Sequence, residues 1–453
     1  MTKTQEKRAL SLTEGPVTGN IVLFALPLML SNLFQQLYNS IDSAVVGTFA
    51  GDVSLAAVGS TAALINLMIG FFLGIATGTG VLYAMRFGAE DWPGLKRICD
   101  ASIFLACAAG IGISVFGICF APRLLRMMQM PENVLPEAIL YLRIYLIGVV
   151  PNLLYNVSAG MIRAKGDSKR PLLYLGFSGL LNLVMDLLLV ALLRWGAAGA
   201  AAATVLAQVL SCLLSVGHLM RLDPRYRFRP LQMRLERGAL WDVIRISVPC
   251  GLQSAMFNIA NLIVQMKINA FGSVAMAGVA AYSKLDGFIY MPLNALSLTA
   301  STFVGQNVGA GHLERVRRGI RICLLLSVGV GLVMSWSVIG LFRPAVSVFT
   351  REPDAVEFAR EMMWFMAPFI ICFVPSDILG GAMRGAGEAT AVMLISAICI
   401  CVFRVLWLTL ALRVVYDIRT VYLCYAISWT LSSSVMTAYY LRFSQLKKYI
   451  RSH

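Results

Sequence analysis

Long apolar segments recur along the whole sequence, and their number limits the folds that the chain can adopt. A helix that crosses a lipid bilayer needs about 20 mostly apolar residues. Twelve segments of this kind occur, six in each half of the chain. They lie near 17–49, 54–85, 98–122, 134–160, 170–193, 197–220, 239–271, 274–306, 319–342, 355–382, 390–412 and 418–443. The pattern predicts an all-α polytopic membrane protein with twelve transmembrane helices.

The composition favours lipid over water as the solvent. Hydrophobic residues make up 58% of the 453 residues and charged residues only 13%, with a mean hydropathy of +0.75. Soluble domains carry about 25% charged residues. The ten cysteines lie in apolar runs without a CxxC pair, and the three histidines are far apart. We interpret them as helix residues rather than as disulfide or metal ligands. The polar N-terminus shows no cleavable signal peptide.

Basic residues predict how the chain is oriented. With both termini on one side, most of the 38 lysine and arginine residues fall on that side. By the positive-inside rule this side, with both termini, is expected to be cytoplasmic. The net charge of +15 is then explained by topology, so we expect anionic membrane lipid rather than nucleic acid as the partner. The opposite loops hold Arg123, Arg126, Arg194, Arg343, Arg351, Arg413 and Arg419.

The two halves of the sequence are copies of each other. "RFGAEDWPGLKR" at 86–97 aligns with "NVGAGHLERVRR" at 307–318, and "AGMIRAKGDS" at 159–168 with "GGAMRGAGEA" at 380–389, both at a spacing of 221 residues. In the first span of each half the spacing is 222, which pairs Asn39 with Asn261. Because each half has six spans, the repeats are parallel.

The duplication predicts the domain organisation. We expect a cytoplasmic N-terminus over 1–16, an N-lobe over 17–220, a cytoplasmic linker over 221–238, a C-lobe over 239–443 and a cytoplasmic C-terminus over 444–453. Transporters built from such repeats hold their substrate between the halves and move the halves to alternate access. The sequence therefore predicts two six-helix lobes around a central cavity.

A polar stripe interrupts the first span of each half. Polar side chains inside a span face protein or a water-filled cavity. In the first half the stripe is Ser31, Gln35, Tyr38, Asn39 and Asp42; in the second it is Ser254, Asn258, Asn261 and Gln265, with Val264 in place of the acid. Both halves are therefore expected to line a wet interior, and only the first places a carboxyl group there.

Asp42 is the main candidate for a coupling site. A charge at mid-membrane costs about 3 kcal/mol on insertion scales, so such an acid is expected to bind a proton or a cation. Asn182 and Asp186 lie one turn apart in "LLNLVMD", and Asn156 and Thr204 on neighbouring spans are expected to join them. Carboxyl and neutral oxygen ligands suit either a proton relay or a Na⁺ site. The alternative is a structural hydrogen bond between helices.

Two further charged residues lie in the second half. Asp377 occupies the repeat position of Asn156, and Arg404 lies deep in an apolar span. A lone arginine there is costly, so Asp377, or else Asp286, is expected to pair with it. The pair is either structural or a site for a cationic substrate. At a spacing of 221, residue 403 matches Asn182. Arg404 is the next residue, so its side chain is expected to point about 100° away from the helix face that corresponds to Asn182.

Nucleotide and enzyme chemistry find little support. The segment "GIATGTG" at 74–80 is interpreted as a small-residue helix-packing seam, and no GxxxxGK[ST] motif occurs. We therefore expect no ATP, no cofactor and no enzymatic activity. The chain is expected to act as a monomer on small organic molecules.

The motif set resembles a known transporter family. "LPLMLSNLFQQLYNSIDSAVVG", "MIRAKGDSKRP", "LLNLVMD" and "FVGQNVGAG" are similar to segments of the MATE (multidrug and toxic compound extrusion) family, and the likeness covers nearly the whole chain. It is nearest to the MepA-like and DinF-like bacterial branches, which implies a place in the plasma (inner) membrane of a bacterium. The resemblance implies export of amphipathic, often cationic, organic compounds and drugs in exchange for H⁺ or Na⁺.

The resemblance also implies particular site residues. In DinF-like members the cation-coupling site lies in the N-terminal lobe, and its positions fall here on Asp42, Asn156, Asn182, Asp186 and Thr204. The substrate cavity is expected to include Gln35, Tyr38, Asn39, Asn258, Asn261, Gln265, Asp377 and Arg404. The NorM-like branch uses a glutamate in the seventh span, where this sequence has no acid beyond Asp242 at the cytoplasmic start.

One alternative function belongs to the same superfamily. Flippases of lipid-linked saccharides share the twelve-span architecture, and their cavities are expected to carry several cationic side chains for pyrophosphate. The stripes here are neutral or acidic, which favours the efflux pump. Substrate identity and the choice between H⁺ and Na⁺ stay open at this point.

Overall fold

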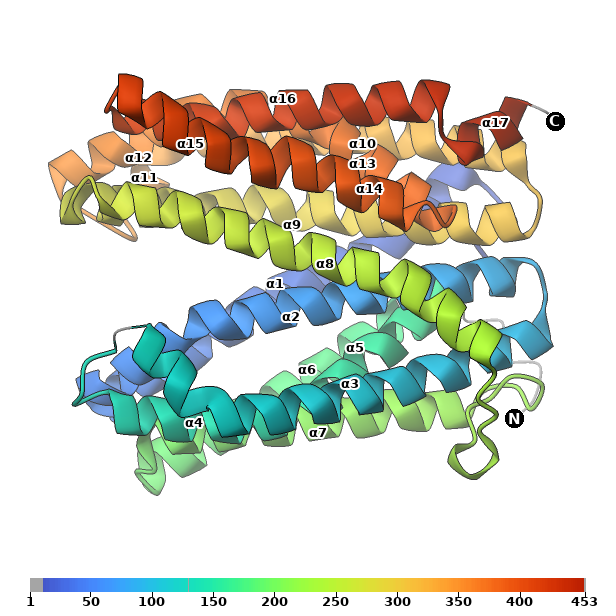
Figure 1. The fold of residues 1–453 in the computed structure, drawn as a ribbon, viewed down its shortest axis with the longest axis horizontal. Coiled ribbons are helices and arrows are strands. Elements are labelled where there is room, and N and C mark those ends of the chain that lie inside the picture. The colour runs from blue at the N-terminus through green and yellow to red at the C-terminus, as the bar shows by residue number, and fades with distance from the viewer. Residues whose placement is uncertain (1–10, 129, 452–453) are drawn as a thin grey trace. The chain divides into compact units, whose positions relative to one another are not determined.

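A computed structural model describes residues 11–128 and 130–451 of the chain. Within these ranges, the side chains that lie outside the description are those of Tyr38, Asn39, Ser40, Ser43, Asp52, Lys448, Tyr449 and Arg451. The polar-stripe residues Tyr38 and Asn39 are therefore placed only by their backbone. The described part of the fold is built of helices and contains no strand (Figure 1).

The helices follow the expected spans closely. The first half comprises α1 Val17–Phe49, α2 Gly51–Gly88, α3 Trp92–Met127, α4 Leu135–Ile147, α5 Val149–Ala164, α6 Lys169–Asp186, the π-helix η2 Leu187–Leu192 and α7 Gly196–Met220. The linker holds the short 3₁₀ turn η3 Pro230–Gln232. The second half comprises α8 Arg237–Asn269, α9 Ser273–Gly309, α10 Leu313–Gly340, α11 Phe342–Val346, α12 Pro353–Met366, the 3₁₀ turn η4 Ala367–Phe369, α13 Ile370–Gly385, α14 Ala389–Ser396, the π-helix η5 Ala397–Val402, α15 Phe403–Val414, α16 Ile418–Arg442 and α17 Gln445–Arg451.

Most of these helices can cross a membrane by length and composition. Nine spans within the described residues qualify, or ten when α4 and α5, bent by 44° at Gly148, are counted as one. The two other expected spans correspond to α9 and α16, which are continuous helices of 37 and 25 residues. Span ten is broken like span four: α12 ends in the 3₁₀ turn η4 before α13 begins.

The chain divides into two compact units, and both divisions fall inside a helix. Unit 1 contains residues 26–248, and unit 2 contains residues 11–25 and 249–453. The N-terminal part of α1 thus belongs to unit 2, whereas the N-terminal part of α8, together with residues 221–236, belongs to unit 1. Each point where the chain passes from one unit to the other lies next to a proline inside its helix. These prolines are Pro27 in α1 and Pro249 in α8.

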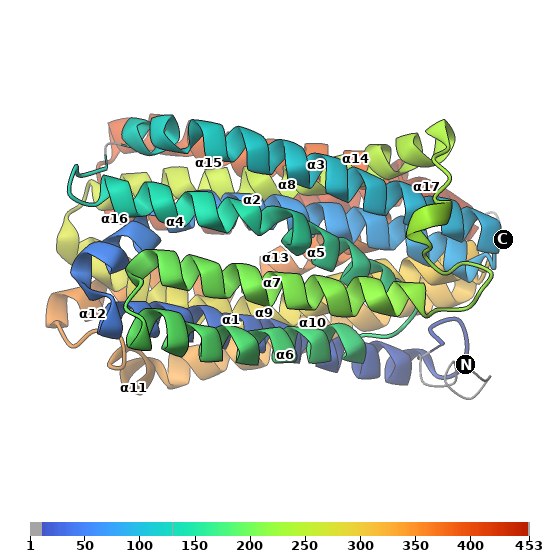
Figure 2. The ribbon, with the colours of Figure 1, turned by 90° about the horizontal axis from the view of Figure 1, so that it is seen from below.

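The same helix packing occurs in each unit. In unit 1, α5 packs against α2, α3 and α7, and α7 also packs along α6 (Figure 2). In unit 2, α13 packs against the corresponding helices α9, α10 and α16. The internal repeat in the sequence therefore corresponds to the same arrangement of packed helices in both units.

Two glycines show how closely this packing is conserved between the halves. A Cβ atom on Gly160 of α5 would lie 2.6 Å from the carbonyl oxygen of Ala76 on α2. A Cβ atom on Gly381 of α13 would lie 2.6 Å from the carbonyl oxygen of Ser297 on α9. The two contacts are related by the spacing of 221 residues. At both crossings the backbones approach too closely for any residue larger than glycine.

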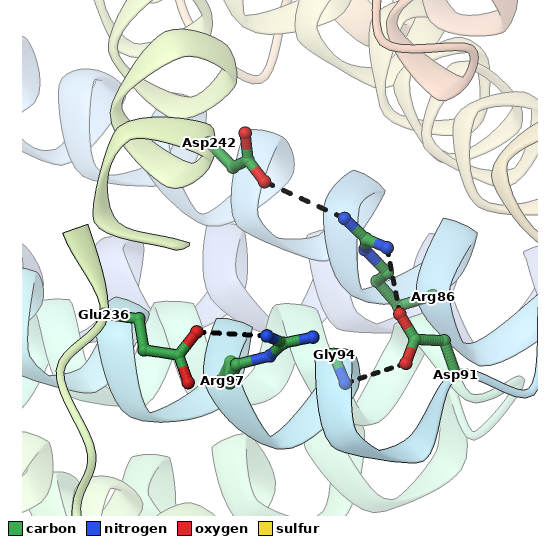
Figure 3. Close-up of polar contacts among 6 residues, drawn as sticks. All are labelled: Arg86, Asp91, Gly94, Arg97, Glu236 and Asp242. Atoms are coloured by element: carbon green, nitrogen blue, oxygen red, sulfur yellow. Dashed lines mark hydrogen bonds and ion pairs between the residues drawn. The ribbon is translucent and has the colours of Figure 1, made fainter. Parts of the chain in front are cut away.

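Polar contacts hold the segments that lead into the first helices. In unit 1 the Arg86 guanidinium contacts Asp91 at 2.9 Å and Asp242 of α8 at 3.8 Å, and Arg97 binds Glu236 at 3.0 Å (Figure 3). Asp91 also accepts a hydrogen bond from the Gly94 amide at the start of α3. These contacts hold the N-terminal end of α8 within unit 1.

Unit 2 holds the segment before α1 in the corresponding way. Arg315 of α10 donates to the carbonyl oxygens of Gly15, at 2.8 Å, and of Glu14, at 3.0 Å. Asn307, which is the repeat counterpart of Arg86, donates to the carbonyl oxygen of Leu12 at 3.1 Å. The connection between the second and third helices of each half therefore holds a segment that enters a first helix.

Glycine substitutions test the close contact between α5 and α2 and its counterpart between α13 and α9. We expect Gly160→Ala and Gly381→Ala each to destabilise the protein by about 1–3 kcal/mol, because the added methyl group overpacks against rigid backbone. Gly176→Ala in α6 is the control: nothing lies within 4 Å of its Cβ position, so only helix propensity changes and stability stays equal or rises slightly. Thermal denaturation of the purified variants measures both effects. Equal melting temperatures for all three would contradict the close crossing.

Candidate functional site

The two acids of the first half meet inside unit 1. Asp42 of α1 and Asp186 at the end of α6 share a hydrogen bond between their carboxyl groups. Asp186 is fully buried, and the Oδ1 atom of Asp42 is buried without a hydrogen-bond partner among the described residues. Two ionised carboxylates at such a contact repel each other, so the arrangement favours a proton or a cation between the two acids. A buried oxygen pair of this kind is suited to hold a proton or a small cation.

The other residues of the expected ion set contribute unequally. Asn182 is 2% exposed and lies one helical turn before Asp186 on the same face of α6. Thr204 of α7 is buried, and its hydroxyl donates to the Ala200 carbonyl at 3.0 Å. The Asn156 amide donates to the Asn152 backbone carbonyl at 2.9 Å and to the Asn152 side chain at 2.7 Å. Asn156 therefore binds within its own helix, α5.

Two tyrosines beside the acids were not singled out in the sequence. Tyr141 and Tyr145 are each 5% exposed, lie one turn apart on α4 and stack with ring centroids 6.3 Å apart. Tyr141 lies near enough to interact electrostatically with both Asp42 and Asp186, and Tyr145 lies near Asp42 and beside Gln208 of α7. The sequence feature that could have identified them is a pair of tyrosines four residues apart in an apolar span, which places both hydroxyl groups on one helix face. Their hydroxyl groups can donate hydrogen bonds near the acids.

Arg404 has neutral partners rather than the expected acid. Its Nε donates to the Ser428 hydroxyl at 3.0 Å, its Nη1 donates to Asn261 Oδ1 at 2.9 Å, and the guanidinium lies 4.3 Å from the Tyr425 ring centroid. No ion pair between Arg404 and Asp377 or Asp286 is present, and all three side chains are described. The expected pairing is therefore wrong.

The two alternative acids have partners of their own. Asp377 accepts a hydrogen bond from Ser297 at 2.9 Å and interacts electrostatically with Arg384. Asp286 accepts one from the Tyr282 hydroxyl at 3.4 Å. Asp377 therefore belongs to a group on α9 and α13, which does not include Arg404.

A π-helix corrects the expected orientation of Arg404. A π-helical turn contains one residue more than an α-helical turn, and η5 lies before Arg404, whereas η2 lies after Asp186. The extra residue of η5 therefore changes the repeat spacing from 221 to 222 for the residues that follow η5 in the second half, and the extra residue of η2 restores it to 221. The buried Asn182 and Asp186 then match Arg404 and Leu408, which are 3% and 1% exposed. Arg404 thus faces the interior, contrary to the 100° rotation expected at a spacing of 221.

The remaining cavity candidates are less constrained. The Asn258 amide donates to the Ser254 carbonyl at 3.0 Å, and the Gln265 amide donates to Asn269 at 2.8 Å. Asn261 is exposed, and Gln35 is half-buried on α1. The side chains of Tyr38 and Asn39 lie outside the described residues.

A double-mutant cycle tests the partners of Arg404. Asn261→Ala and Arg404→Gln break the same hydrogen bond, so we expect their effects on stability to be non-additive by about 0.5–3 kcal/mol. Asp377→Asn and Arg404→Gln share no partner, so their effects should add to within about 0.5 kcal/mol. Denaturation of the single and double variants measures both couplings. Rescue of Asp377→Asn by a substitution at Arg404 would contradict the observed geometry.

Comparisons with known proteins agree with this architecture. The sequence model of the MatE family matches residues 27–188 and 249–408. The chain is 29% identical over 400 residues to a probable multidrug resistance protein, YpnP of Bacillus subtilis, covering 88% of this chain and 89% of the relative. It is 20% identical to the multidrug export protein MepA of Staphylococcus aureus, covering 85% and 86%.

The fold is also that of solved transporters. A structure of a MOP superfamily transporter from Pyrococcus furiosus superimposes with a TM-score of 0.89 at 23% identity, over 97% of this chain and 99% of the other. The expected fold, an all-α membrane protein of twelve helices in two lobes, is thereby confirmed. The relatives and the apolar helices place the protein in a bacterial membrane as a multi-pass protein. The two regions matched by the family model cover most of both halves, and the chain belongs to the MATE family of multidrug efflux transporters.

Proposed function

We propose that the protein is a secondary active antiporter that exports amphipathic, often cationic, organic compounds and drugs in exchange for H⁺ or Na⁺. The observation that carries this proposal is the buried carboxyl pair of Asp42 and Asp186. The relatives named as multidrug proteins support the substrate class. In the same proposal both termini are cytoplasmic and the chain works as a monomer among anionic lipids, without ATP.

The carboxyl pair supplies a binding site for the driving ion. Loss of the shared proton leaves two like charges close together in a buried site, which is unfavourable unless a cation replaces it. Asn182, one turn from Asp186, adds an amide oxygen of the kind that hard cations accept as a ligand. Tyr141, held near both acids, can donate a hydrogen bond to the charged form. The site therefore has a filled state that is strongly preferred over an empty, doubly charged one.

Ion binding drives export if the filled and empty states favour different conformations of the transporter. Ions enter from the side where their electrochemical potential is high and leave on the other side. A substrate that binds only after the ion has left is carried in the opposite direction. A ligand shifts such an equilibrium only by its difference in affinity between the two states. Asp42 lies on α1, a helix shared by both units, and this position suits a link between ion binding and rearrangement.

Neutralising one acid tests the coupling role. We expect Asp42→Asn to reduce ion-driven efflux to the level of protein-free vesicles while expression and folding are retained, because the amide keeps the shape but cannot exchange a proton. Efflux is measured in reconstituted vesicles under an imposed pH gradient and, separately, under a Na⁺ gradient, which also identifies the driving ion. Glu132→Gln, at an exposed position, is the matched control. Efflux by Asp42→Asn at the wild-type rate would refute the coupling role.

Growth assays separate the pump from a flippase. The comparisons do not favour a lipid-linked saccharide flippase. We expect a pump-deficient bacterium that expresses the wild-type chain to tolerate a panel of toxic organic cations at raised concentrations. Cells that express Asp42→Asn to the same level should remain sensitive. Equal sensitivity of wild-type and empty-vector cells to every compound would count against drug export.

A further inference from the structure

A groove on unit 1 lies apart from the carboxyl pair. It is formed by α2, α3 and α4, has a volume of about 300 Å³ and is lined by apolar side chains and glycine. Leu64 and Met68 contribute from α2, and Leu142 contributes from α4. On α3 the lining extends from Gly112 to Leu124, which is about 18 Å of helix at 1.5 Å per residue. The groove is therefore long, narrow and apolar.

Two glycines of α3 keep the groove open. A Cβ atom on Gly112 would have nothing within 4 Å, and a Cβ atom on Gly117 would lie 2.9 Å from Cδ1 of Leu146. At a spacing of 221, the corresponding residues of α10 in unit 2 are Val333 and Val338. Unit 2 therefore has valine side chains where unit 1 has only hydrogen atoms.

The same hydrogen bond in both units fixes this correspondence. Ser114 of α3 donates to the carbonyl oxygen of Leu146 at 2.7 Å, and Ser335 of α10 donates to the carbonyl oxygen of Ala367 at 2.6 Å. The two donors are 221 residues apart, and so are the two acceptors. The helices therefore pack alike at this point, and the groove of unit 1 arises from its side chains.

The groove opens on an exposed apolar surface. Gly112 is exposed, and Ile111, Val115 and Phe116 beside it on α3 are each more than half exposed. In a multi-pass membrane protein, acyl chains cover a surface of this kind. Space left empty beside apolar side chains forfeits dispersion contacts. An acyl chain that enters the groove restores them.

A cation lies beside one end of the groove. Phe116, which lines the groove, stacks on Phe120 with ring centroids 4.3 Å apart. The Arg123 guanidinium lies 5.6 Å from the centroid of Phe120. Arg123 is exposed, one turn before α3 ends at Met127, and it makes no ion pair within residues 11–128 and 130–451. An anion from the membrane surface can therefore reach it.

The position of Arg123 matches the dimensions of a lipid. A phospholipid of one leaflet has its phosphate at the interface, and its chains extend about 15 Å to the midplane, half of the hydrocarbon thickness. The groove begins at Leu124, beside Arg123, and continues for about 18 Å along α3 to Gly112. Charge at one end and apolar depth along the rest are the two properties that a phospholipid requires.

We propose that this groove binds an acyl chain of an anionic phospholipid and that Arg123 binds the phosphate of the same molecule. Exposed arginines near a membrane surface attract anionic lipid headgroups, and a guanidinium can donate two parallel hydrogen bonds to a phosphate. The bound chain fills the space beside Gly112 and adds contacts to three helices of unit 1. The inference does not rest on drug export, because lipid binding needs neither the driving ion nor a drug.

Photolabelling in vesicles tests the site. The full-length protein is reconstituted in phosphatidylcholine that contains a trace of phosphatidylglycerol with a diazirine at the end of one acyl chain. A diacylglycerol with the same chain is the probe without a phosphate. Mass spectrometry of peptides measures the label on Leu64 and Met68, relative to the label on Val333, an exposed residue of α10. We expect phosphatidylglycerol to label Leu64 and Met68 more strongly than diacylglycerol does, and unlabelled phosphatidylglycerol to compete with it.

Substitution of Gly112 tests the groove. Gly112→Leu places a side chain in open space, so the fold is retained while labelling of Leu64 and Met68 falls for both probes. Gly112→Val, which introduces the residue found in unit 2, is a second variant with the same expected loss. Gly176→Leu, at an exposed glycine of α6 with nothing within 4 Å of its Cβ position, is the matched control. Melting temperatures of the purified variants verify folding.

Substitution of Arg123 tests the phosphate contact. We expect Arg123→Gln to lower labelling by phosphatidylglycerol about fivefold, the usual effect of one arginine near an anionic surface, and to leave labelling by diacylglycerol unchanged. Arg413→Gln, at the exposed end of α15, is the control for removing a positive charge. Equal phosphatidylglycerol labelling of the wild type and a folded Gly112 variant overturns the inference. Equal labelling of the wild type and Arg123→Gln, or of the wild type by the two probes, overturns it as well.

Discussion

Two carboxyl groups that hydrogen-bond inside a membrane-spanning bundle impose the strongest constraint on this molecule. Asp42 and Asp186 come from the first and fifth spans, and their contact favours a shared proton or a bound cation because two ionised carboxylates repel each other. Asn182 lies one turn from Asp186, and Tyr141 lies near enough to both acids to interact with them electrostatically. Without a proton or a cation the pair would be two buried like charges, which is unfavourable.

The scaffold around the pair is duplicated, whereas its chemistry is not. The crossing of Gly160 with Ala76 recurs as the crossing of Gly381 with Ser297, at the same Cβ distance. Side chains at the candidate site positions differ instead: Val264 and Leu408 stand in unit 2 at the positions of Asp42 and Asp186, and Arg404 stands at the position of Asn182. A repeat can keep its close backbone contacts while its polar positions change, because those positions line the interior and do not set helix packing. In the proposed antiporter, this difference gives the carboxyl pair to one half alone.

Much of the fold was predictable from the sequence, and the reasons are physical. Apolar segments long enough to span a bilayer, a repeat at constant spacing and acids in apolar surroundings each have a single dominant interpretation in lipid. The shared buried face of Asn182 and Asp186 followed from the periodicity of the helix. The partners of Arg404 did not follow, because a π-helical turn adds a residue without a clear sequence signal. Tyr141 and Tyr145 were overlooked because aromatic side chains in apolar spans are usually packing residues.

The shared proton of the carboxyl pair is the central claim, and infrared difference spectroscopy tests it most directly. A protonated carboxyl group and an ionised carboxylate absorb at separate frequencies, so the protonation of a buried pair can be followed in the intact protein. The account predicts a band from a protonated carboxyl group in the wild type that is lost when the proton is removed or replaced by Na⁺, and that is absent from Asp186→Asn. A wild-type spectrum in which this band is missing, or one in which it persists unchanged in Asp186→Asn, would contradict the account.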